Sequence, residues 1–182
     1  MLYAATLFDN IGGVKTLILA ALALLIAWYL HHLSKKEKQE KLTQALTAER
    51  LANTADEELV GTVVRDLLDS CERKHRESNL PFTTPDVYRM VPLWTNPQVN
   101  VYTVWVAVKE IGAGGIAGMK SSPSAPFMAL AADGFLQIGA AACAAALQAE
   151  DDEAFATAVT AEQPLALCVE YIRDHADAFV KE

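Results

Sequence analysis

The feature that most constrains this chain is an apolar run near its start, Thr16–Leu33 (TLILAALALLIAWYLHHL), which contains no Asp, Glu, Lys or Arg. A helix needs about 20 apolar residues, within a range of roughly 17–25, to cross the hydrocarbon of a bilayer. Trp28 and Tyr29 lie near the end of the run, where amphipathic rings favour the membrane interface. The run therefore predicts a single transmembrane helix within residues 1–33, with Thr16–Leu33 in contact with lipid.

Two other interpretations of this run are a cleaved signal peptide and a buried helix of a soluble protein. A signal peptide needs a basic start and small residues before the cleavage site, whereas this chain begins MLYAATLFDN and the run ends in bulky side chains. The run is close to the lower length limit for a membrane span, so a buried helix of a soluble protein remains an alternative interpretation. A single-pass anchor fits the pattern best.

The charges that flank the run predict its orientation. Cytoplasmic flanks of membrane helices carry an excess of Lys and Arg. Only Lys15 precedes the run, opposed by Asp9, whereas four lysines follow it, at positions 35, 36, 38 and 41. We therefore expect the N-terminus outside, the rest of the chain in the cytoplasm, and a location in the inner (cytoplasmic) membrane of a bacterium.

After the anchor, the chain divides into a charged segment and a longer segment in which apolar residues recur at helical spacing. Residues 34–52 are rich in good helix formers of mixed charge, which predicts a helical stalk. Residues 53–182 have the length of one ordinary domain, in a chain that is 52% hydrophobic and 21% charged. We expect a compact all-α cytoplasmic domain of about five helices.

The expected helices follow from caps and apolar periodicity. A capping box at Thr54–Glu57 opens the first, which should run to about Arg76. Threonine or asparagine followed by proline marks two further starts, at Thr84-Pro85 and at Asn96-Pro97. Helical spacing then predicts a long helix over Phe127–Gln148, a shorter one over Ala154–Val159, and a final one over Pro164–Lys181. Close packing is the expected reason for Gly134 and Gly139 in the long helix.

One segment, Gln98–Ile111, supports two interpretations. Its valines and aromatic residues favour a strand, and the glycines that follow would then resemble a phosphate-binding loop. The third glycine of that motif would fall at Ala117, and no Lys-Ser/Thr follows. Interpreted as a helix, the segment ends in a tight turn in which Gly114 and Gly115 have a structural role. The helix and turn are the better fit.

No catalytic, cofactor-binding or metal-ligating pattern stands out. Cys71 and His75 are four residues apart, but no second Cys/His pair lies at ligand spacing. Cys143 and Cys168 also fall in apolar helical contexts, which are typical of free buried thiols. The acid–base candidates Glu110, His75 and His175 come without a nucleophile pattern, so we expect no enzyme, unless the fold brings Glu110 and a histidine together in a cleft.

Negative charge is concentrated in the last third of the chain. The formal net charge of the whole chain is −8. From Ser121 onward the chain contains ten acidic residues but only two basic ones, Arg173 and Lys181. This balance argues against direct nucleic-acid binding and favours either plain solubility or attraction to a basic protein. The candidate acidic interaction face consists of Asp151, Asp152, Glu153, Glu162, Asp174 and Asp177.

Several short patterns in this domain can be compared with a known family. They are Glu110-Ile111 with Gly114-Gly115, then Ser121-Ser122, then Phe135–Ala140 (FLQIGA), and finally Tyr171–His175 with Phe179. Across about Glu57–Phe179 the chain resembles a bacterial helical family of unknown function whose described member is a small acidic DNA-mimic protein. Two departures are Ala113, where the family has Asn, and Ile116, where it has Phe.

The resemblance implies an all-α domain, a homodimer, and surface carboxylates that occupy basic DNA-binding proteins. The residues themselves predict a membrane-anchored interaction or scaffold module with an unknown protein partner. The alternative is an acidic DNA-mimic decoy. Clustering of the six candidate acidic residues on one face would favour the decoy, and scattering would count against it.

Overall fold

The computed structural model describes residues 26, 28–29, 46–76 and 82–180. The chain forms two units, Met1–Gln44 and Ala45–Glu182. In the first unit Ile26, Trp28 and Tyr29 are helical and exposed. Most of Thr16–Leu33, and all of the stalk up to residue 45, lies outside the described residues. No helix in the described part of the chain is both long and apolar enough to span a bilayer.

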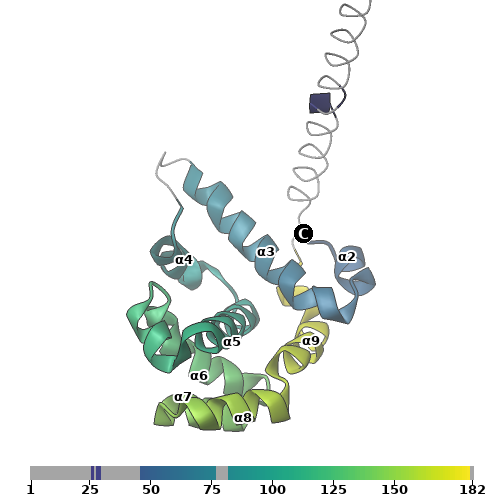
Figure 1. Ribbon diagram of the computed structural model, residues 1–182. Coiled ribbons are helices and arrows are strands. Elements are labelled where there is room, and N and C mark those ends of the chain that lie inside the picture. Colours follow the sequence, from purple (N-terminus) through teal and green to yellow (C-terminus); the bar gives the residue numbers. More distant parts are fainter. Residues whose placement is uncertain (1–25, 27, 30–45, 77–81, 181–182) are drawn as a thin grey trace, which may run out of the picture. The chain divides into compact units, whose positions relative to one another are not determined.

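The second unit is all-helical and contains eight α-helices in its described residues (Figure 1). The all-α class is confirmed, although the number of helices exceeds the five expected. They are α2 (Ala48–Asn53), α3 (Asp56–His75), α4 (Thr84–Met90), α5 (Asn96–Ser121), α6 (Met128–Gln137), α7 (Ala141–Ala149), α8 (Asp152–Glu162) and α9 (Pro164–Asp174). Three short 3-10 turns, at Val91–Leu93, Ala125–Phe127 and Ala176–Ala178, join or end these helices.

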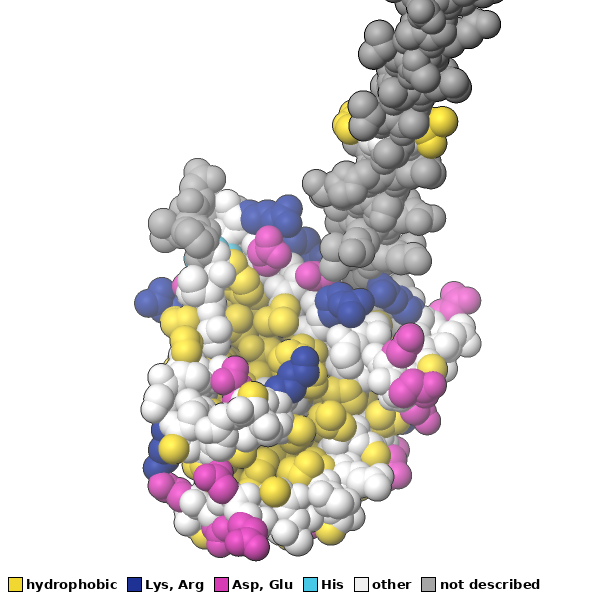
Figure 2. All heavy atoms as spheres, viewed as in Figure 1, with side chains coloured by type: hydrophobic (Ala, Val, Ile, Leu, Met, Phe, Trp, Pro, Cys, Tyr) yellow, Lys and Arg dark blue, Asp and Glu magenta, His cyan; other side chains and the backbone are white. Residues whose placement is uncertain are grey.

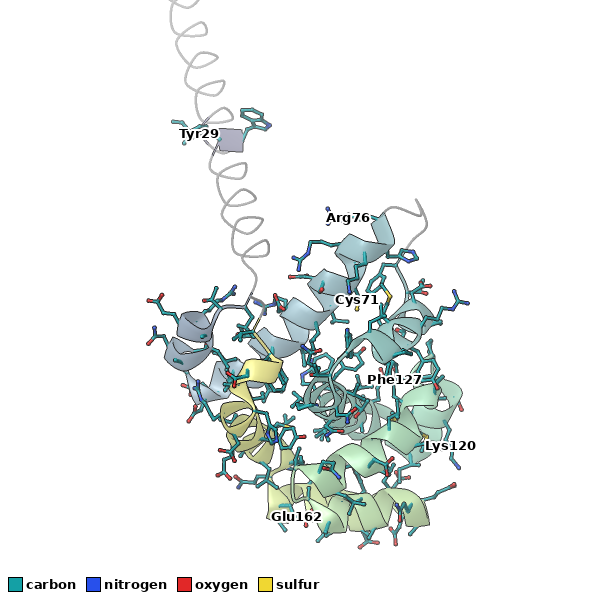
Figure 3. All side chains as sticks on the ribbon, turned by 180° about the vertical axis from the view of Figure 1, so that it is seen from behind. Tyr29, Cys71, Arg76, Lys120, Phe127 and Glu162 are labelled. Atoms are coloured by element: carbon teal, nitrogen blue, oxygen red, sulfur yellow. The ribbon has the colours of Figure 1, made fainter. Side chains whose placement is uncertain are left out.

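Helix α5 lies at the centre, with α3, α6, α8 and α9 packed against it (Figure 1). Its segment Gln98–Ile111 is helical, so the strand interpretation is wrong. Valines of this segment are buried all round the helix, and such a position between other helices overrides their strand propensity. Phe127 and Phe135 are fully buried beside α5, and Figure 3 shows Phe127 inside the domain.

The interface between α5 and α6 depends on Gly134. A Cβ at Gly134 would lie 3.1 Å from the Asn100 carbonyl oxygen and 3.0 Å from Thr103 Oγ1. Close packing, the reason expected for this glycine, is therefore what the structure shows. Gly139 is different, because it has open space around it and a φ of +89°. It separates α6 from α7, so the single helix expected over Phe127–Gln148 is two helices.

Several helix boundaries differ from the sequence-based expectation by one or a few residues. Thr83 and Thr95, each one position earlier than expected, form capping boxes with Asp86 and Gln98. Thr54 does not cap α3; its hydroxyl instead donates to the Arg50 carbonyl oxygen at 2.6 Å. The two shifts of a cap to the preceding residue arise because threonine and asparagine can both cap a helix, so the sequence alone does not select between Thr83 and Thr84 or between Thr95 and Asn96.

Residues 46–53, expected at the end of the stalk, are packed into the helical domain. Leu46 and Leu51 are buried, and the Leu46 amide donates to Asp66 at 3.2 Å. Arg173 of α9 fixes the same segment, because its guanidinium donates to the carbonyl oxygens of Leu51 and Thr54. The folded domain therefore begins close to residue 45.

Candidate functional site

The helical backbone of α5 is interrupted at Gly115, whose φ of +69° and ψ of 176° are not helical, so a turn lies within the expected Gly114-Gly115 pair. A second helical stretch then runs from this kink to Ser121. The kink frees the Ile116 amide from its helical partner, and Asp152 Oδ1 accepts from that amide at 2.7 Å. A carboxylate of the same chain therefore occupies the position in which a phosphate loop would hold an anion.

Three of the six candidate acidic residues have structural partners within the domain. Asp151 caps α8 by accepting from the Ala154 amide at 2.9 Å, and Asp152 caps the second half of α5 as described above. Glu162 accepts from the amides of Ala142 and Cys143, both at 2.9 Å, at the start of α7. Burial opposes ionisation of Glu162, but these amide hydrogen bonds outweigh it and lower its pKa below the usual 4.5.

The acidic residues do not form one continuous patch on the face seen in Figure 2. Acidic side chains lie there in separate groups around the rim, and hydrophobic side chains occupy the middle. Asp151 and Glu162 lie at opposite ends of α8, an eleven-residue helix about 16 Å long. Glu153, Asp174 and Asp177 are exposed. Lys120 also pairs with Glu150, which removes one more carboxylate from the free negative surface.

A groove of about 510 Å³ lies between α3, α5 and α9, and we name it the Trp105 groove. Its walls combine Val60, Val169, Leu165 and the half-buried ring of Trp105. Leu165 is a large apolar side chain, yet it is 37% exposed in this groove. Figure 2 shows hydrophobic side chains gathered on the face that carries these helices. The remaining lining residues are Asp56, Glu57, Gly61, Ala166 and Glu170.

The groove has an acidic rim. Asp56 is paired with Arg173 at 3.0 Å, whereas Glu57 and Glu170 form no ion pair with any other described residue. The unit from Ala45 to Glu182 contains twenty Asp and Glu against ten Lys and Arg. An apolar groove with this rim is complementary to an apolar segment flanked by basic side chains.

A second cavity, of about 330 Å³, lies on the other side of Trp105, and we name it the Glu110 pocket. Its polar lining residues include Tyr102, Glu110 and Ser124, together with Thr83, Thr84 and Lys109. The Ser124 hydroxyl donates to Glu110 at 3.4 Å. The Lys109 ammonium lies 4.4 Å from the centre of the Trp105 ring, at the boundary between groove and pocket. No histidine is among the described residues that line the pocket.

The other reactive groups of the domain lie apart from these cavities. His75 packs against Phe82, with ring centres 5.6 Å apart, and His175 is exposed and stacks on Tyr171. The three cysteines are free and buried, and burial raises the pKa of Cys168 to about 12. In the described residues, no group of three potential metal ligands occurs.

A hollow of about 700 Å³ lies between α7 and α8 and is lined mainly by alanines. It contains no aromatic ring, and one of its few polar groups, Asp151, already caps α8. Aromatic anchors dominate the energetics of most binding surfaces. The Trp105 groove is therefore the stronger candidate, although no apolar pattern in the sequence distinguished it, because its lining comes from three helices far apart in the chain.

No family model, curated protein or solved structure matches this chain.

Proposed function

We propose that this protein is a membrane-anchored interaction module, in which residues 1–33 hold the chain in the bilayer and the helical domain captures a protein partner. The observation that carries the proposal is the Trp105 groove, an open apolar groove with an aromatic wall and an acidic rim. The helical positions Ile26, Trp28 and Tyr29 support the anchor, because their large apolar side chains are exposed and exposed apolar side chains suit a lipid environment.

The partner that fits the groove is an apolar helical or extended segment flanked by Lys or Arg. Leu165, Val169 and Trp105 would contact its apolar side chains, and Glu57 and Glu170 would attract the flanking charges. Apolar burial would supply most of the affinity, and the acidic rim would mainly raise the association rate and select the partner.

Gly61 allows a direct test, because a Cβ at this position on α3 meets no heavy atom within 4 Å. Gly61→Arg places a long side chain over the groove, and arginine is a good helix former. Gly112→Arg is the matched control, since Gly112 is also helical and has open space. Full-length protein is purified in detergent from the source cells, and the co-purifying proteins are quantified.

We expect Gly61→Arg to reduce one specific partner by about tenfold or more, which corresponds to roughly 1.4 kcal/mol. Gly112→Arg should retain that partner at the wild-type level. Equal retention by both variants would contradict a role for the groove.

The second candidate function is an acidic decoy for a basic DNA-binding protein. It is favoured by the resemblance to the family with a DNA-mimic member and by the excess of acidic residues. The use of Asp151, Asp152 and Glu162 as caps counts against it, because a decoy needs free carboxylates at roughly phosphate spacing. Competing duplex DNA would release the partner of a decoy, whereas it would leave a partner bound in the Trp105 groove in place.

A further inference from the structure

The Glu110 pocket holds polar groups that the folded domain leaves without a strong partner. Glu110 is half-buried, and among the described residues no basic side chain forms an ion pair with it. Its hydrogen bond to Ser124 is long, at 3.4 Å. Partial burial of a carboxylate without a cationic partner has a free-energy cost of desolvation, and a bound cation can offset this cost.

The phenol of Tyr102 is a second polar group in the same pocket. Tyr102 lines the pocket and is only 4% exposed, and its hydroxyl forms no hydrogen bond with the other described residues. Burial first, and then the nearby Cys71 and Glu110, raise its pKa to about 12. The phenol is therefore neutral at physiological pH and is available as a donor and an acceptor beside the carboxylate.

The rest of the pocket wall combines apolar side chains with Thr83, Thr84 and Lys109. Leu68, Phe82, Val87 and Val106 line it, and the pocket meets the Trp105 groove at the Trp105 ring. Lys109 does not satisfy Glu110, because its ammonium lies over Trp105. A ligand with a short apolar stem and a terminal cation matches both the wall and the carboxylate.

We propose that the Glu110 pocket binds an alkylammonium or alkylguanidinium group, held by Glu110 through a charge-assisted hydrogen bond and by Tyr102 through its hydroxyl. Two sources share this chemistry, namely an arginine or lysine side chain of a protein and a free small amine. The pocket is separate from the Trp105 groove, so this inference does not depend on the proposed docking function.

The test uses the full chain in detergent micelles with 15N-labelled tryptophan. Its three tryptophans, Trp28, Trp94 and Trp105, give three indole N–H signals, and Trp105→Phe assigns the one that reports on the pocket. The probes are butylguanidinium, agmatine and the tripeptide Ac-Ala-Arg-Ala-NH2, with butanol and butyrate as uncharged and anionic controls. Trp28 is the internal reference.

We expect butylguanidinium to shift the Trp105 signal with a dissociation constant on the order of 1 mM, and butanol and butyrate to leave it unchanged. Glu110→Gln should weaken binding by roughly tenfold and Tyr102→Phe by a smaller factor. Glu58→Gln, which neutralises an exposed acid outside both cavities, should bind like the wild type. Unshifted Trp28 and Trp94 signals in Glu110→Gln would show that the variant remains folded.

Tighter binding of the arginine tripeptide than of agmatine would indicate a protein side chain as the source, and the reverse order would indicate a free amine. Either result supports the pocket. Equal responses to butylguanidinium and butanol, or wild-type affinity in a folded Glu110→Gln variant, would overturn the proposal.

Discussion

Asp152, at the start of α8, accepts a hydrogen bond from the backbone amide of Ile116, 36 positions earlier in the chain, at 2.7 Å. This contact stabilises the kink of α5 at Gly115 and ties α8 to the central helix. It also gives a structural role to an acidic residue whose charge alone suggested an external partner. Negative charge alone therefore does not show which carboxylates in and around α8 are free to bind a partner.

Removing this cap should destabilise the domain. Asp152→Ala leaves the Ile116 amide without its partner, and loss of a side-chain cap costs about 1 kcal/mol. Glu153→Ala is the matched control, because Glu153 is exposed and its side chain forms no hydrogen bond or ion pair with the other described residues. Urea unfolding of the full chain in micelles, followed by circular dichroism, measures the difference. Equal midpoints for the two variants would contradict the capping role.

Gly115→Ala should be more damaging than Asp152→Ala. Gly115 has φ +69° and ψ 176°, a backbone conformation that is essentially restricted to glycine, so alanine there costs about 1–3 kcal/mol. Its methyl group would also lie 3.1 Å from Asp152 Oδ2. Gly118→Ala should have the opposite effect and stabilise the domain by about 0.5–1 kcal/mol, because Gly118 is helical and has open space. The same unfolding assay compares them, and a neutral Gly115→Ala would show that the kink is not required.

Glu162 should make stability depend on pH. Its pKa is lower in the folded state than its usual 4.5, so its contribution is fully present above the unfolded-state pKa. That contribution is lost as pH falls through the folded-state pKa. Glu162→Gln should therefore be less stable than the wild type by about 1 kcal/mol at neutral pH, and this difference should shrink as the pH falls below 4.5. An unchanged difference between pH 7 and pH 3 would rule out this linkage.

The proposed anchor predicts how the chain behaves in membranes. The full chain should remain in the membrane pellet after alkaline carbonate extraction, because a spanning helix is held by the hydrocarbon. Protease added to the outside of intact cells should leave the helical domain uncut. Replacement of Lys35, Lys36, Lys38 and Lys41 by Asn should expose the domain in a fraction of the molecules, since these charges set the orientation. Release of the wild-type chain by carbonate would contradict the anchor.

The helices were predictable where apolar periodicity and caps agree, as in α3, whose residues Leu59, Val63 and Leu67 are buried as the pattern indicates. Boundaries within glycine-containing segments were not. Gly115 and Gly139 both have positive φ, but one kinks a helix that continues and the other separates two helices. That outcome depends on Asp152 and on the α5–α6 packing, which are contacts between residues far apart in the chain.

The candidate site was even harder to predict from the sequence than the helix boundaries. The sequence placed Trp105 in the segment Gln98–Ile111 and Leu165 in the final helix expected over Pro164–Lys181, with no sign that the two would meet. Their exposure in one groove results from the way α3, α5 and α9 diverge, and no local pattern encodes that arrangement. Glu110 was considered only with a histidine, whereas the structure places it with Tyr102 and Ser124.

The most direct measurement of the central claim is site-specific photo-crosslinking in the source cells. A photoreactive phenylalanine analogue replaces Leu165 in the Trp105 groove or, as the control, Leu136 on α6, which is 51% exposed and lies outside the groove. We predict one protein adduct from position 165 that is absent from position 136 and lost in the Gly61→Arg background. Identical adducts from both positions, or an adduct at 165 that persists with Gly61→Arg, would contradict docking of a protein partner in the groove.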